Sequence, residues 1–289
     1  MSYSPVVGGH HGVGFPLQFP SAKITDVSLS TTLVEQLSPA DDNVVISHGT
    51  GFFWRHGTDV FLITARHVVT GRDPFTNEPM SNKGFLPERF RFYPTIEVSP
   101  DRWGRATVRL DFATDEPTNW LEDPEFERLR TDIAALKVTS LSGVLGRKIK
   151  CLNDEPSNFS DIMSSVGFEC SIIGFPQANV GGLMTPIWRR GTLASEPLLP
   201  VDSKPMFLLD ASTSPGFSGG PVFRRHIGPA PTIDADGSVE VKLDAVVTMS
   251  FVGVYAGRLS HSHFGGEVPF VFYGNRIPII LGAAATLPS

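Results

Sequence analysis

One serine stands in a stretch of sequence that is rich in glycine. Ser218 lies within SPGFSGGPVF (214–223), among two prolines and three glycines. Such residues disfavour a helix and leave backbone N–H groups free to face a ligand. A serine hydroxyl becomes an effective nucleophile when a base lies within hydrogen-bond reach. The stretch could therefore hold the nucleophile of a hydrolase, or it could be a sharp turn before a strand.

Two further residues with suitable chemistry lie upstream, each at the edge of an apolar run. His67 stands at the end of FLITARHVV (61–69), and Asp132 stands at the head of TDIAALKV (131–138). Taken alone, such a histidine is more often structural, and such an aspartate usually belongs to a turn or cap. Taken together with Ser218, they give the chain order His, Asp, Ser. That order favours a base, an orienting carboxylate and a nucleophile.

GFSGG also matches G-x-S-x-G, the strand-to-helix elbow of α/β-hydrolases, in which the acid and the histidine follow the serine. Acidic and histidine residues in that order do follow Ser218: Asp234, Asp236, Asp244, His261 and His263. The elbow serine is followed by a helix, however, and PVF (221–223) is a poor helix interior. An esterase of that type is therefore the less favoured hypothesis.

The elements that would position these residues are short β-prone runs separated by turn residues. The chain has 24 prolines and 28 glycines. This pattern predicts an all-β fold rather than alternating strands and helices. Residues 56–59 predict a hairpin turn, and 122–130 is the best helix candidate. Segments 70–87 and 226–238 are predicted to be loops, the second an insertion between two strands.

The combined pattern resembles the trypsin/chymotrypsin-like serine peptidases, and more closely their bacterial single-chain and HtrA-like members. The motifs that carry the resemblance are GTGFFW (49–54), LITARHVV (62–69), TDIAALKV (131–138), IIGFP (172–176) and DASTSPGFSGGPVF (210–223). The resemblance implies two packed antiparallel six-stranded β-barrels with the site between them. We expect a flexible segment at 1–22, a first barrel at 23–150 and a second at 151–289, with 148–164 as the linker.

The resemblance also implies a role for each site residue in a serine endopeptidase that works through an acyl-enzyme. Ser218 would be the nucleophile, His67 the general base and Asp132 the residue that orients the imidazole. The backbone N–H groups of Gly216 and Ser218 would form the oxyanion hole. Phe217 departs from the digestive enzymes, which carry there an aspartate that pairs with a newly cut N-terminus.

The same alignment places a substrate pocket at Ser212, Ser250, Phe251 and Val252. No acid lies at its expected base, and Val252 replaces a frequent glycine, so a small or medium apolar P1 residue is expected. A protease-like fold that serves only as a binding module is the other alternative. The presence of all three catalytic residue types and of Gly216 favours the enzyme.

Composition limits the partners. The net charge is −6 without a basic run, so we expect no nucleic-acid partner, and the longest apolar stretches, such as 277–285, are too short to span a bilayer. The N-terminus shows no secretory signal, which favours a cytoplasmic location, and Cys151 and Cys170 are expected to be reduced. We expect a protein or peptide substrate, no cofactor and no metal; the sequence does not identify a regulatory partner.

Overall fold

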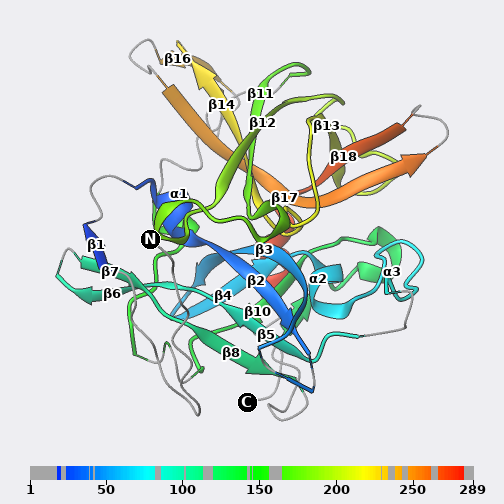
Figure 1. Cartoon of the computed structure of the whole chain (residues 1–289). Helices are drawn as coiled ribbons and strands as arrows, with labels where there is room; N and C mark the ends of the chain where they lie inside the picture. The colour runs from blue at the N-terminus through cyan, green and yellow to red at the C-terminus, as the bar shows by residue number, and fades with distance from the viewer. Residues whose placement is uncertain are drawn as a thin grey trace.

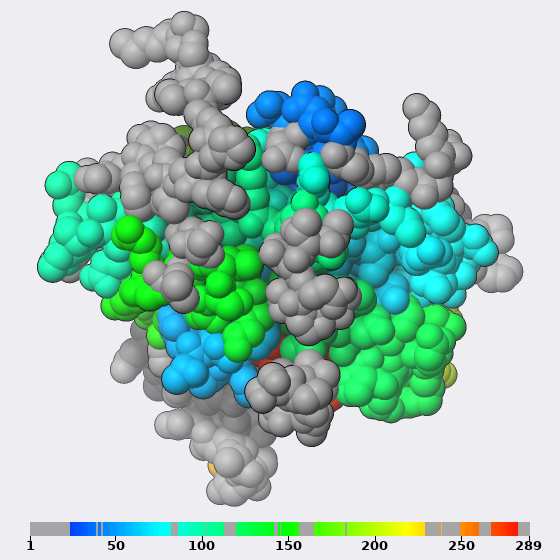
Figure 2. All heavy atoms as spheres, turned by 90° about the horizontal axis from the view of Figure 1, so that it is seen from below, coloured from blue at the N-terminus to red at the C-terminus, as the bar shows by residue number. Residues whose placement is uncertain are grey.

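The computed structural model describes residues 18–20, 24–38, 40–41, 43–81, 86–100, 102–112, 120–141, 144, 146–155, 165–228, 230–233, 238–242, 247–261 and 266–282. Two β-structures stand one above the other in Figure 1, the N-terminal one below and the C-terminal one above. The face seen from below in Figure 2 consists mostly of N-terminal segments, coloured blue to green. The fold is all-β and chymotrypsin-like, as the sequence predicts.

The N-terminal half is built on one antiparallel sheet that curves into a half-barrel. Its strand order is β8-β5-β2-β3-β4-β10-β9. The strands are β2 (Thr31–Leu37), β3 (Val45–His56), β4 (Asp59–Thr64), β5 (Arg89–Phe92), β8 (Val108–Asp111), β9 (Trp120–Glu122) and β10 (Ala134–Lys137). A smaller sheet pairs β1 (Gln18–Pro20), β7 (Arg102–Arg105) and β6 (Thr95–Ser99). Short helices α1 (Asp26–Ser30), α2 (Arg66–Thr70) and α3 (Phe126–Leu129) connect the strands.

The C-terminal half is a closed barrel of six strands in the order β11-β12-β13-β18-β17-β14. Its strands are β11 (Glu169–Gly174), β12 (Ile187–Leu193), β13 (Met206–Asp210), β14 (Pro221–Ile227), β17 (Val247–His261) and β18 (Gly266–Tyr273). Three one-turn 3-10 helices lie at Leu152–Asp154, Pro176–Ala178 and Gly182–Met184, and α4 (Arg276–Gly282) follows the barrel. Thus one half closes fully, whereas the described part of the other remains an open sheet of seven strands.

Alternation along β3 joins the two halves. Successive side chains of a strand point to opposite faces of its sheet. Phe53 accordingly lies in the apolar interior of the N-terminal half. Phe52 and Trp54 lie instead in a second cluster, which also contains Phe223 and Phe272 of the C-terminal barrel. β3 therefore buries one face within its own half and the other against the second half.

The local predictions had mixed outcomes. The hairpin at 56–59 is confirmed, with Gly57 at a positive φ between β3 and β4. The helix expected over 122–130 is only one turn, α3, because Glu122 instead ends β9. The predicted loop at 226–238 was wrong: β14 continues to Ile227, and β15 (Ala230–Ile233) pairs with β16 (Val239–Lys242) as a second hairpin.

The expected linker is partly a packed segment. Ile149 bridges to Ile96 of the smaller sheet, and Cys151 and Leu152 are fully buried. Residues 156–164 lie outside the described part of the chain, as do most of 1–22. No helix within the described residues is long and apolar enough to cross a membrane.

Candidate active site

The pairing of two strands brings His67 to Asp132. β10 pairs antiparallel with β4, so the start of β10 lies beside the end of β4, where α2 begins. The buried Asp132 carboxylate accepts the backbone N–H of His67 through Oδ1 at 2.8 Å and contacts Nδ1 through Oδ2 at 2.6 Å. Because an ionised carboxylate only accepts, Nδ1 must carry the proton. The other ring nitrogen, Nε2, is then the basic one in the neutral ring.

The electrostatics of this pair favour the protonated imidazole. Burial alone would lower the pKa of His67, whose side chain is only 13% exposed. The charge and the hydrogen bond of Asp132 outweigh burial, with a smaller contribution from Asp73, and the pKa of His67 is raised above its ordinary value. His67 is therefore a stronger base than a free histidine.

An arginine that the sequence analysis did not single out anchors the helix carrying His67. The Arg66 guanidinium lies 3.7 Å from the centre of the Phe126 ring on α3, and its Nε donates to Glu122 on β9 at 2.5 Å. These contacts tie the first turn of α2 to the segment that leads into Asp132. Arg66 and Phe126 are far apart in the sequence and belong to no shared motif, so the sequence carries no signal for this contact.

The segment carrying Ser218 docks onto the same region of the N-terminal half. The Ser218 carbonyl accepts the backbone N–H of Thr50 on β3 at 2.8 Å. A Cβ placed on Gly49 would lie 3.2 Å from that carbonyl and 2.8 Å from the side chain of Val68, the residue after His67. The structure thus brings Ser218 and the start of α2 to one point on β3.

The peptide groups around Ser218 have fixed orientations. The Pro215 carbonyl accepts from Gln177 N–H, and the Phe217 carbonyl accepts from Gly220 N–H, both at 2.8 Å. In a planar trans peptide the N–H points opposite to the C=O. The N–H groups of Gly216 and Ser218 therefore point away from these donors. Within the described chain, neither N–H donates to a protein acceptor.

Only glycine fits at position 216. Its φ is +105°, and a Cβ there would lie 2.3 Å from the Phe175 carbonyl and 2.9 Å from Nε2 of His48. His48 was not singled out by the sequence analysis. Its Nε2 is buried without a hydrogen-bond partner, and burial lowers its pKa despite the nearby charge of Glu35.

The structure places the expected substrate-pocket residues on two segments, the loop before Ser218 and strand β17. Ser212 is exposed in the loop before Ser218, whereas Ser250 and Phe251 pair with Arg224 and Phe223, well along β14 from Ser218. The Phe251 ring lies 5.6 Å from that of Phe52, centre to centre, within the shared core.

A different part of β17 lies beside the serine. Val252, on which the prediction of a small P1 residue rested, packs against the interior cluster of the C-terminal barrel. The Ala256 carbonyl instead accepts from Ser218 Oγ at 3.4 Å. β17 spans fifteen residues with an irregularity between Tyr255 and Gly257, so the residue of this strand that contacts the serine lies four positions beyond Val252.

The elbow alternative is contradicted by the fold around Ser218. Strand β14 begins at Pro221, directly after the loop, where an α/β-hydrolase would have a helix. His261 ends β17, and the other residues of that hypothesis, Asp234, Asp236, Asp244 and His263, lie outside the described residues. No cluster of metal-ligating side chains occurs among the residues that the structure describes.

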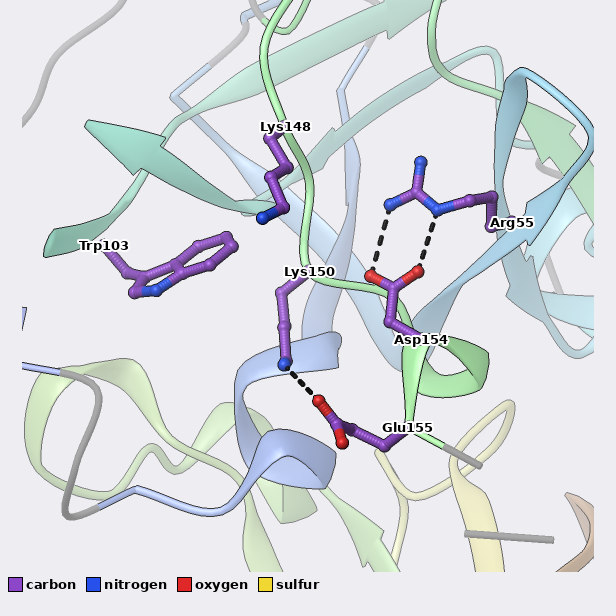
Figure 3. A pocket seen from close by; sticks show the side chains of 6 residues that line it. All are labelled: Arg55, Trp103, Lys148, Lys150, Asp154 and Glu155. Carbon is purple, nitrogen blue, oxygen red and sulfur yellow. Dashed lines mark hydrogen bonds and ion pairs between the residues drawn. The ribbon is translucent and has the colours of Figure 1, made fainter. Parts of the chain in front are cut away.

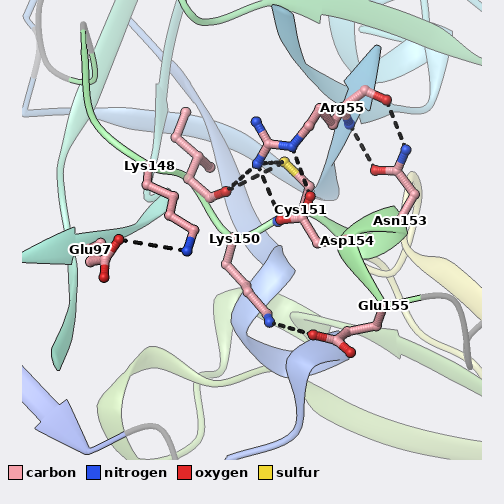
Figure 4. Close-up of polar contacts among 9 residues, drawn as sticks. Arg55, Glu97, Lys148, Lys150, Cys151, Asn153, Asp154 and Glu155 are labelled. Carbon is pink, nitrogen blue, oxygen red and sulfur yellow. Dashed lines mark hydrogen bonds and ion pairs between the residues drawn. The ribbon is translucent and has the colours of Figure 1, made fainter. Parts of the chain in front are cut away.

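A separate cavity of about 430 Å³ is lined by Arg55, Trp103, Lys148, Lys150, Asp154 and Glu155 (Figure 3). Its cations all have carboxylate partners. Arg55 forms a fork with Asp154, Lys150 contacts Glu155, and Lys148 lies 3.7 Å from Glu97 (Figure 4). Lys150 also contacts Asp26. This charge balance suits a structural junction between β3 and the segment that leads to the second barrel.

Comparison with known proteins places this geometry in a family. The model of the trypsin-like peptidase domain matches residues 49–228, which include His67, Asp132 and Ser218. A comparison with curated proteins finds no significant match.

Solved structures resemble the chain at low identity. Deg5 is 16% identical, with a TM-score of 0.46 over 87% of this chain and 86% of its own. The Rv3671c protease of M. tuberculosis in its active form is 15% identical, with a TM-score of 0.42, and the match covers 99% of this chain and 97% of that chain. A variant of the HtrA-type protease AlgW with a tripeptide is 15% identical, with a TM-score of 0.46, and the match covers 90% of this chain and 61% of that chain. Since the family model spans more than half of the sequence, the chain belongs to the trypsin-like peptidase family and is a serine-type endopeptidase.

Proposed function

We propose that Ser218, His67 and Asp132 form the catalytic triad of this endopeptidase. The observation that carries the proposal is the double hydrogen bond from His67 to the buried Asp132 carboxylate. It leaves Nε2 as the only basic nitrogen of the ring. The docking of the Ser218 segment on β3 supplies a hydroxyl beside the same helix.

The chemistry proceeds by acyl transfer. His67 Nε2 takes the proton of Ser218 Oγ as the oxygen attacks the carbonyl carbon of the substrate, and a tetrahedral intermediate forms. His67 then gives that proton to the departing amine, which leaves an ester on Ser218. Water, activated by the same imidazole, releases the acid. Asp132 holds the ring and stabilises its cation throughout.

The two unpaired N–H groups of Gly216 and Ser218 serve as the oxyanion hole. Charge develops on the carbonyl oxygen during attack, and donors that are already oriented stabilise it without reorganisation. In the structure Ser218 Oγ donates weakly to Ala256 O at 3.4 Å. Rotation about its Cα–Cβ bond brings Oγ to His67 in the reactive complex, since catalytic hydrogen bonds often tighten only when substrate is bound.

A fluorophosphonate probe tests the proposal, because such probes phosphonylate only an activated serine. We expect labelling of the wild type and none of Ser218→Ala. Labelling of His67→Ala should be slower by several orders of magnitude. Ser214→Ala, in the same loop, is the matched control and should label at the wild-type rate.

Labelling that persists in Ser218→Ala would overturn the assignment of the nucleophile. A folded wild type that does not label would support a catalytically silent binding module instead.

A further inference from the structure

We propose that the hydroxyl of Thr50 is a positioning group for the oxyanion hole. The inference rests on the proposed role of the loop at residues 215–219, called here the oxyanion loop. Thr50 lies in the middle of β3, belongs to the N-terminal half and is fully buried. The oxyanion loop belongs to the C-terminal half, so the proposal assigns part of the site to a residue from the opposite side of the domain boundary.

Thr50 makes four hydrogen bonds, three of them to the C-terminal half. Its Oγ1 donates to the Gly216 carbonyl at 2.6 Å and accepts Phe175 N–H at 3.0 Å. Its backbone N–H donates to the Ser218 carbonyl at 2.8 Å. Its own carbonyl accepts Thr64 Oγ1 at 2.7 Å. Both capacities of the hydroxyl are used, and the side chain cannot turn without breaking one of these bonds.

These bonds complete the fixing of the oxyanion loop. The Pro215 carbonyl accepts from the backbone N–H of Gln177, and the Phe217 carbonyl accepts from that of Gly220. The Gly216 carbonyl accepts from Thr50 Oγ1, and the Ser218 carbonyl accepts from Thr50 N–H. Each of the four consecutive peptide planes is therefore held by a bond to its carbonyl, and the fourth is also held by the bond from Gly219 N–H to the Tyr255 carbonyl at 2.7 Å. The plane after Gly216 is the only one of the four held by a side chain.

That plane lies between the planes of the two proposed donors, because the N–H of Gly216 belongs to the plane before it and the N–H of Ser218 to the plane after it. Glycine at φ +105° has more backbone freedom than any other residue, so Gly216 is the natural hinge of the loop. With the planes before and after it both anchored, the two dihedral angles of Gly216 are fixed, and the N–H groups of Gly216 and Ser218 keep one orientation relative to each other. When the Thr50 bond is lost, the plane between the two donors loses the bond on its carbonyl, and the two N–H groups are less strictly preorganised. Thr50 touches neither substrate nor reacting atoms, so it acts through Gly216.

The test compares two substitutions at Thr50 with a distant control. Thr50→Val replaces the hydroxyl with a methyl group of similar size, and Thr50→Ser keeps the hydroxyl. The control is Thr31→Val, because Thr31 is equally buried and its Oγ1 also donates to a carbonyl, that of Val27, at 2.6 Å. Thr31 starts β2 and contacts no residue of the oxyanion loop through this bond. The control therefore reports the effect of a lost buried hydroxyl alone.

The kinetic readout is the rate of labelling by the fluorophosphonate, separated into the binding constant of the probe and the maximal rate of attack. For Thr50→Val we expect the maximal rate to fall about 10- to 100-fold per folded molecule. This is less than the roughly 100- to 1,000-fold cost of removing an oxyanion donor outright. The binding constant should stay within about twofold, because binding precedes charge development. Thr50→Ser should recover most of the rate, and Thr31→Val should keep it.

Amide hydrogen exchange gives a second readout that needs no activity. Exchange of the peptide that covers the oxyanion loop should accelerate in Thr50→Val and stay at the wild-type rate in Thr31→Val. If wild-type labelling does not depend on Ser218, the proposed triad fails, yet exchange still decides whether Thr50 holds the loop. Unchanged exchange in a folded Thr50→Val, or a rate loss equal to that of Thr31→Val, would overturn the inference.

Discussion

Replacing Asp132 with asparagine tests the most specific part of the mechanism, the tautomer of His67. The Asp132 carboxylate accepts two hydrogen bonds from His67, one from its backbone N–H at Oδ1 and one from Nδ1–H at Oδ2. An asparagine offers one acceptor and one donor. If its NH₂ faced the backbone N–H, two donors would meet in a buried place, at a cost of about 1 to 3 kcal/mol. The amide oxygen therefore takes the backbone N–H, and the NH₂ faces Nδ1.

The neutral imidazole then has the wrong proton arrangement. Nδ1 must accept from the asparagine, so the ring proton moves to Nε2, which can no longer take a proton from Ser218. We expect the rate of fluorophosphonate labelling to fall about 10⁴-fold. At about 1.36 kcal/mol for each tenfold change, this equals a barrier increase of about 5 kcal/mol. The assay is labelling at neutral pH, corrected for the folded fraction by circular dichroism.

Asp123→Asn is the matched control for loss of a buried carboxylate. Asp123 has a fully buried side chain and accepts Arg276 Nε and Nη2 at 2.7 and 2.6 Å. Its loss should lower the unfolding free energy by a few kcal/mol, as for a broken buried pair. The labelling rate of the folded molecules should be unchanged. A folded Asp132→Asn that keeps more than a tenth of the wild-type rate would refute the tautomer argument.

Three further predictions concern the loop, the base and the fold. Gly216→Ala should fold but label at least about 100-fold more slowly, since its Cβ has no room; a wild-type rate would show that Gly216 N–H is not a donor to the oxyanion. The wild-type labelling rate should rise with pH through the raised pKa of His67, and Asp73→Asn should shift that midpoint downward; a shift upward would contradict the sign of the interaction. Asp154→Asn should lower the unfolding free energy in urea by about 1 to 2 kcal/mol at neutral pH by breaking the fork with Arg55. Burial raises the pKa of Asp154, but the ion pair with Arg55 holds it below its ordinary value. The difference in unfolding free energy between wild type and Asp154→Asn should therefore vanish as pH falls through the folded-state pKa of Asp154. A difference that stays constant with pH would exclude Arg55 as the cause.

Much of the site was predictable because local sequence patterns mark it. His67 and Asp132 lie at the ends of apolar runs that become paired strands. Ser218 lies in a loop whose glycines occupy positions where a Cβ would collide with neighbouring atoms. The hairpin at 56–59 was predictable for the same reason, since Gly57 adopts the left-handed conformation that such turns favour. In each case a feature within about ten residues determines the local backbone.

The part of β17 that lies beside Ser218 was not predictable, because it depends on register along a long strand. A shift of a few residues along β17 decides whether Phe251 or Ala256 lies beside Ser218, and apolar alternation allows both. The role of Thr50 was also beyond reach, since its bond to Gly216 joins residues 166 positions apart. A threonine inside an apolar strand looks like an ordinary β-prone residue until its partners are known.

The position of Thr50 on β3 links the docking of the two halves to the assembly of the site. Thr50, Phe52 and Trp54 alternate along β3 and therefore share one face of the strand. Phe52 and Trp54 bury their rings against the C-terminal barrel. Thr50, two residues before Phe52, donates hydrogen bonds to the Gly216 and Ser218 carbonyls of the oxyanion loop. The apolar contact that joins the halves thus also sets the height and angle at which Thr50 meets Gly216. His67 and Asp132 are fixed to the N-terminal half by β4 and β10. A slip between the halves would therefore separate the proposed base from the proposed nucleophile and also release the oxyanion loop. The geometry needed for attack and the geometry needed to stabilise the oxyanion therefore depend on a single packed interface.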